Sequence, residues 1–133
     1  MQPRIHPAIA GQHYRSLELK SRVESASPHG LVSLLYEELL RSLDLASASF
    51  NKDNMAAGNR HIAKAESIII ALEGSIDFDR GGDLATTLQR VYRACHKGLR
   101  DAQANSDRKK LAEVREAVSD IAYAWQALAN PRT

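Results

Sequence analysis

The sequence has little of what would place the protein in a membrane or in an oxidising compartment. Cys95 is its only cysteine, so no disulfide can form within the chain. It has no run of 18 apolar residues that would predict a transmembrane helix. The first residues include Pro3, Arg4 and Pro7 and lack the apolar stretch of a signal peptide. We therefore expect a soluble, cytoplasmic protein that does not insert into membranes.

An excess of charge of one sign is also lacking. The 18 basic and 16 acidic residues leave a formal net charge of +2, which is too balanced for a protein that binds nucleic acid by releasing counterions. The sequence has neither the Glu-x-x-His spacing of a di-metal bundle nor a glycine-rich loop followed by Lys and Ser or Thr. These patterns predict no metal, no cofactor, no catalytic site and no nucleic-acid partner.

Proline is lacking between residues 29 and 130, a segment rich in Ala, Leu, Glu, Lys and Arg, and this composition favours helices. Ser27-Pro28 is typical of a helix start, with an N-cap followed by proline at the first helical position. Gly74 ends the second expected helix and Gly81-Gly82 precedes the third. The four expected helices span about 28–50, 54–73, 82–105 and 107–129.

These helices predict an all-α fold, an antiparallel four-helix bundle over residues 27–130 that is about 30 Å long. Residues 1–26 contain two prolines and Gly11. We expect them to form an N-terminal arm that is partly helical at most.

Apolar residues recur at helical spacing on each expected helix, and they predict the core. On the fourth helix they are Leu111, Val114, Val118, Ile121, Trp125 and Leu128. On the third they are Leu84, Leu88, Val91, Cys95, Leu99 and Ala102. On the first two they are Val32, Leu35, Leu39, Leu43, Ala46, Phe50, Ile62, Ala65, Ile69 and Leu72.

Other apolar residues project away from these stripes on a helical wheel, in which successive residues are 100° apart. They are Leu31, Leu34, Leu45, Ile68 and Ile70, with Tyr92 at the edge of a stripe. Several exposed apolar residues on two or three helices indicate a surface that binds a partner. A wide core stripe, or cover by the arm through Leu17, Leu19 and Val23, explains them equally well.

Short motifs follow one another in a fixed order between Tyr14 and Leu128. They are Ala26-Ser27-Pro28-His29, Leu35-Tyr36-Glu37, Ile62-Ala63-Lys64-Ala65, the acidic double-glycine loop from Ile76 to Ala85, Val91-Tyr92 and Ala124-Trp125. In their order and spacing they resemble the FliS family of flagellin-export chaperones. Thr87 and Arg93 depart from residues common in that family.

The resemblance implies a small four-helix bundle that is not an enzyme. Such a protein binds the C-terminal segment of flagellin in the cytoplasm, prevents premature polymerisation and delivers the client to the flagellar type III export gate, an FlhA-like protein. It also implies a role for Tyr14 in docking on that gate, and close approach of the client backbone at Ala63, Ala85 and Ala94. We expect a monomer or weak homodimer. The residues expected to bind the client are Ile68, Ile70, Val91, Tyr92, Leu31, Leu34 and Leu45.

Two other functions stay open at this stage. His96-Lys97-Gly98 resembles the exposed histidine of histidine-phosphotransfer domains, although the spacing is one residue short of the usual one. A relay of this kind would depend on His96. The other alternative is a structural helical subunit that dimerises through its apolar faces.

Overall fold

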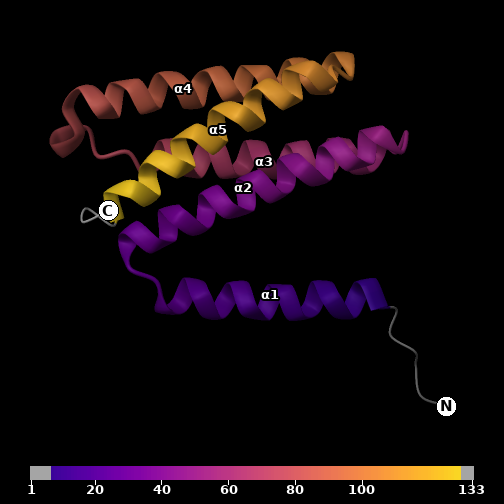
Figure 1. Ribbon diagram of the computed structural model, residues 1–133, viewed down its shortest axis with the longest axis horizontal. Coiled ribbons are helices and arrows are strands. Elements are labelled where there is room, and N and C mark those ends of the chain that lie inside the picture. The colour runs from indigo at the N-terminus through magenta and orange to yellow at the C-terminus, as the bar shows by residue number, and fades with distance from the viewer. Residues whose placement is uncertain (1–6, 130–133) are drawn as a thin grey trace.

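The computed structural model describes residues 7–129, and all the secondary structure in that range is helical, which confirms the all-α prediction. Five helices follow one another: α1 (Pro7–Ser25), α2 (Pro28–Asn51), α3 (Met55–Gly74), α4 (Phe78–Asn105) and α5 (Arg108–Ala129). Consecutive helices run in opposite directions (Figure 1). Residues 1–6 of the expected arm, and residue 130 of the expected bundle, lie outside the described range.

Four of the helices pack around one core. Helix α2 packs against α3 and α5, and α4 packs against the same two helices, so that each helix touches two neighbours. The centre is filled by aliphatic side chains that are almost completely buried: Leu39, Leu43, Ile62, Ile69, Leu72 and Leu99. None of the helices within residues 7–129 is long and apolar enough to cross a membrane.

Side-chain caps fix where these helices begin. The Ser27 hydroxyl accepts the Gly30 amide at 3.0 Å, and Pro28 occupies the first turn. The Asn54 side chain accepts the Ala57 amide at 3.1 Å, and the Asp107 carboxylate accepts the Lys110 amide at 3.1 Å. Ser, Asn and Asp all favour the N-cap position, and the starts of α2, α3 and α5 lie within one residue of the expected ones.

The expected N-terminal arm is more helical than the sequence indicated, because residues 7–25 form the continuous helix α1 of 19 residues. Pro7 is its first residue, a position where a missing N–H costs nothing. Helix α1 lies alongside α2 (Figure 1). Arg15 pairs with Glu38, and the Arg22 guanidinium lies 2.9 Å from the Glu37 carboxylate.

Eight residues assigned to the core stripes are less buried than expected, and six of them are half-buried: Val32, Leu35, Leu88, Val91, Ile121 and Trp125. Leu84 is 54% exposed and Leu128 is 62% exposed. Trp125 is half-buried rather than central. Leu84 lies near the start of α4, and Trp125 and Leu128 lie in the last turns of α5. A residue near a helix end has fewer neighbours to cover it, so an apolar stripe that continues to the last turn reaches solvent.

Helix α4 has a kink where a loop was expected. Asp77 caps a first turn by accepting the amides of Asp79 and Arg80, each at 3.1 Å. The chain then bends at Gly82, whose φ of +51° is accessible to glycine at little cost. After this bend α4 runs straight along α3 and α5.

Candidate functional site

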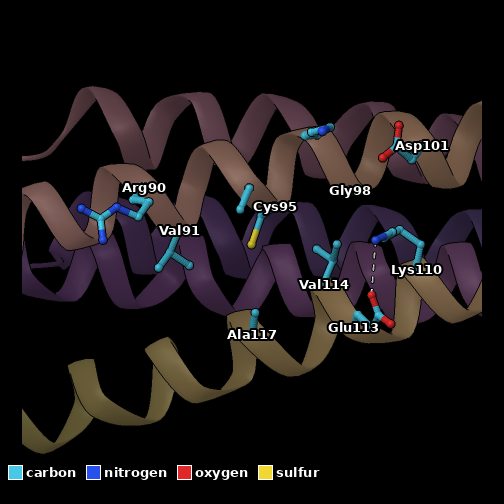
Figure 2. Close-up of a pocket in the computed structure, with 11 residues that line it drawn as sticks. Arg90, Val91, Cys95, Gly98, Asp101, Lys110, Glu113, Val114 and Ala117 are labelled. Atoms are coloured by element: carbon cyan, nitrogen blue, oxygen red, sulfur yellow. Dashed lines mark ion pairs between the residues drawn. The ribbon is translucent and has the colours of Figure 1, made fainter.

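An apolar groove of about 500 Å³ lies between α4 and α5. We refer to it as the α4–α5 groove. Figure 2 shows its side chains facing the space between two helices that separate from Lys110 toward Ala117. Its apolar lining consists of Val91, Ala94, Cys95, Gly98, Val114 and Ala117.

Small residues create this groove. A Cβ atom on Gly98 would lie 2.7 Å from Cγ2 of Val114, so the two helices are in close contact at that point. Ala117 lies farther along, where the helices diverge (Figure 2), and Ala94 also lines the groove. Each of these two residues offers only a methyl group. No large side chain fills the widening space, which leaves it open to an external one.

The rim of the groove is charged and carries both signs. Arg90 and Lys97 lie on α4, and Lys110 and Glu113 on α5 form an ion pair of 3.5 Å (Figure 2). An apolar floor between polar rims is the surface that receives the apolar face of an amphipathic helix.

Cys95 lies at the bottom of the groove and is buried, as the sequence predicted. Burial raises the pKa of its thiol, so the neutral form persists at physiological pH. A neutral thiol is a poor nucleophile and a poor metal ligand. Cys95 therefore acts as a small apolar residue in this surface.

A smaller apolar pocket of about 150 Å³ lies at the end of the molecule where α4 begins. The hydroxyl groups of Tyr36 and Tyr92 are hydrogen-bonded to each other at its base. Burial raises the pKa of both phenols, and for Tyr36 the hydrogen bond to Tyr92 raises the pKa further. We refer to this site as the tyrosine pocket.

Trp125 forms one wall of the tyrosine pocket and connects α5 with α2. Its indole stacks on the His29 ring, with the ring centres 4.2 Å apart and an angle of 7° between the planes. The indole N–H also donates to the His29 carbonyl oxygen at 3.2 Å. Trp125 thus ties the last turns of α5 to the first turn of α2.

The structure does not bring the expected client-binding residues together into one patch. Val91 lines the α4–α5 groove. Ile70 is 60% exposed on α3, and Leu31 is exposed in the first turn of α2. Leu45 is half-buried and lines a different pocket, which lies where α1 passes α2 and α3.

Leu34 and Ile68 correct the expectation that they project away from the core, because both are buried. Tyr92, expected at the edge of a core stripe, is buried as well. Each helix contacts two neighbours rather than one. Its buried arc is therefore wider than a single stripe and takes in residues beside the stripe.

Of the residues expected to allow close backbone approach, only Ala94 lies in the α4–α5 groove; Ala63 is exposed on α3 and Ala85 is buried. Sequence reasoning missed the roles of Gly98 and Ala117. The spacing of Ala94 and Gly98, four residues apart on one helix face, was the available signal. Tyr14 is 76% exposed on α1.

The surroundings of His96 do not favour a phosphotransfer site. Its side chain is half-buried, and Nε2 lies 3.7 Å from a carboxylate oxygen of Glu66. A carboxylate in that position would repel an incoming phosphoryl group. Within residues 7–129 there is also no cluster of three or more His, Cys, Asp or Glu side chains that could hold a metal ion.

Comparison with known proteins gives a consistent result. The family model described as "Flagellar protein FliS" matches residues 10–132. The flagellar secretion chaperone FliS of Salmonella typhimurium is 30% identical, over 93% of this chain and 93% of its own length. The same chaperone from Bacillus subtilis is 30% identical, over 85% of this chain and 84% of its own length. That of Vibrio cholerae is 27% identical, over 88% of this chain and 86% of its own length.

Proposed function

The chain belongs to the FliS family of flagellar secretion chaperones, and we propose that its client is flagellin, bound through the C-terminal segment. The protein is an export chaperone and not an enzyme. In this proposal it acts in the cytoplasm, prevents premature polymerisation of the client and delivers it to an FlhA-like protein of the flagellar type III export gate.

The observation that carries the proposal is the α4–α5 groove. An apolar trough with small residues at its base and charges on both rims accepts one helix of a partner at close range. The groove is about 500 Å³ in volume, enough for several side chains from one face of a helix. Catalysis would require a different arrangement, with convergent polar groups at the base.

A client that is disordered before binding suits such a surface. Folding onto the chaperone costs conformational entropy at the moment of binding, and burial of apolar groups in the groove offsets that cost. The complex is then held by extended contact and remains reversible, which a delivery step requires.

In this proposal the expected client-binding residues divide into two groups. Val91, Ile70 and Leu31 contact the client directly, since their side chains reach the surface. Leu34, Ile68, Tyr92 and Leu45 are buried or half-buried and hold the helices at the spacing that the surface needs.

The four packed helices α2–α5 are, in this proposal, an antiparallel bundle that folds as a unit, and residues 1–26 are an arm. Tyr14 on α1 is the side chain that docks on the export gate, because it is exposed and residues 1–26 contain no other Phe, Tyr or Trp. The free protein is a monomer or a weak homodimer.

Co-purification tests the choice of client. Flagellin that keeps its C-terminal segment is expected to co-purify with the protein, and flagellin that lacks the segment is expected to be lost in the wash. Equal recovery of the two flagellins would overturn the proposal.

A substitution in the groove tests the binding surface. Ala94→Asp places a carboxylate in the apolar lining of the groove, so client affinity is expected to fall more than tenfold, about 1.4 kcal/mol. The matched control is Ala112→Asp, the same change at an exposed alanine of α5 that lies outside the groove lining. Titration calorimetry with the flagellin segment would measure both, and equal affinities would show that the client binds elsewhere.

A further inference from the structure

A third pocket, of about 290 Å³, lies where α1 passes α2 and α3, on helices other than the two that form the α4–α5 groove. Three cationic side chains line it, one from each helix: Arg15, Arg41 and Lys64. Glu38 is the only carboxylate among the lining residues. We refer to this site as the basic pocket.

Glu38 is already occupied by two of these cations. Arg15 pairs with one carboxylate oxygen, and the Lys64 ammonium lies 3.4 Å from the other. Arg41 forms no ion pair with any of the residues 7–129, and it remains half-exposed at the pocket. The pocket therefore holds more positive charge than its own carboxylate neutralises.

His61, which also lines the pocket, reports the same imbalance. Burial lowers the pKa of its imidazole, and the positive charges of Arg60, Lys64 and Arg41 lower that pKa further. Proton uptake at His61 is opposed by three neighbouring cations. An anion in the pocket would relieve that opposition.

The residues outside the described range do not offer an Asp or Glu side chain that could enter the basic pocket. Residues 1–6 and 130–133 contain neither Asp nor Glu. Two leucines, Leu19 of α1 and Leu45 of α2, form apolar walls beside the cations. Cations and apolar walls together match a peptide that carries carboxylates and an apolar side chain.

We propose that the basic pocket binds a short acidic segment of a partner protein, with its carboxylates facing Arg41 and Lys64 and an apolar side chain between Leu19 and Leu45. A single phosphate ion would leave most of the 290 Å³ unfilled and would make no use of the leucines. Nucleic acid is disfavoured as well, because no Phe, Tyr or Trp side chain lines the pocket and the net charge is only +2.

Titration of the full chain with a defined probe tests the proposal. The probe is the capped hexapeptide Glu-Asp-Leu-Glu-Asp-Leu, and its neutral counterpart has Gln and Asn in place of Glu and Asp. The acidic peptide is expected to shift the NMR signals of Arg41, Leu45 and His61 and to raise the pKa of His61. Equal binding of the neutral peptide, or shifts confined to other helices, would overturn the proposal.

A charge reversal locates the contact. Arg41→Glu is expected to weaken binding of the acidic peptide at least tenfold, since Arg41 is the cation that Glu38 does not hold. Arg100→Glu is the matched control, an exposed arginine on α4 with the same change of net charge. It is expected to change the affinity less than twofold. Equal losses in the two variants would mean that only net charge matters, and the pocket would be rejected.

Two further measurements control for unfolding of the variant and for binding of a small anion. If Arg41→Glu lowers the circular dichroism signal of the helices, Arg41→Gln replaces it with the same expected direction. Inorganic phosphate, compared with sodium chloride at equal ionic strength, is expected not to displace the peptide. Complete displacement by phosphate would make this a small-anion site instead. None of these measurements uses flagellin, so their failure would leave the proposed chaperone function untouched.

Discussion

At the scale of single residues, the facing hydroxyls of Tyr36 and Tyr92 depend on each other. Tyr36→Phe or Tyr92→Phe leaves the remaining hydroxyl buried without its partner, so each single variant is expected to lose about 1–3 kcal/mol of unfolding free energy. The double variant removes both polar groups, and its loss should be smaller than the sum of the single losses. Urea unfolding of the four proteins would measure this coupling, and strict additivity would contradict it.

The same pair predicts how stability responds to alkali. Because burial raises the pKa of both phenols, the unfolded chain releases their protons near pH 10 while the native protein retains them. The native state then binds more protons, and stability falls as pH rises above 10. The double Phe variant lacks these groups and is expected to lose less stability over that range.

The burial of individual residues was only partly predictable from the sequence. Ile62 and Leu99 lie at the centre of apolar stripes and are fully buried, as periodicity indicates. Leu34 and Ile68 lie beside the stripes and are buried as well, because a second neighbouring helix covers them. A helical wheel represents a single helix, so it cannot show how many neighbouring helices pack against that helix.

At the scale of elements, the starts of α2, α3 and α5 were predictable because each depends on a cap within a few residues. Helix α1 was not, since Gly11 and Pro7 argued against it. Pro7 at a first helical position removes no hydrogen bond, and a glycine inside a helix costs only about 1 kcal/mol. The α4–α5 groove depends on how two helices diverge, a property that neither helix sequence contains by itself.

Removal of residues 1–26 is expected to leave helices α2–α5 folded. Helix α1 is held to α2 by the exposed Arg22–Glu37 ion pair, which contributes roughly 0–1 kcal/mol, and by the pair of Arg15 with Glu38. The Glu38 carboxylate is buried, and it keeps Lys64 as a partner when α1 is removed. The truncated protein should lose helical signal in proportion to 19 residues and keep a cooperative urea transition. A broad transition, or aggregation of the truncated protein, would show that α1 belongs to the folding unit.

At the scale of the whole molecule, a nearly balanced net charge conceals a local imbalance. The value of +2 argues against a general affinity for nucleic acid. It could not reveal the basic pocket, because Arg15, Arg41 and Lys64 are far apart in the sequence and meet only through the packing of three helices. The family, by contrast, was recognisable in the sequence, because the motif order does not depend on the packing.

The short connection between α1 and α2 means that a small rotation at this point would displace the far end of α1 over a long distance. Only Ala26 and Ser27 separate the two helices, and Tyr14 lies eleven residues before Ser25, about 16 Å from the joint at 1.5 Å per residue. A rotation of roughly 30° at this joint would carry the Tyr14 ring through an arc of about 8 Å. The exposed Arg22–Glu37 ion pair and its neighbour Arg15–Glu38 oppose such a rotation. Salt screens the exposed pair more than the pair of the buried Glu38 carboxylate, so we expect the rotation to become easier as ionic strength rises.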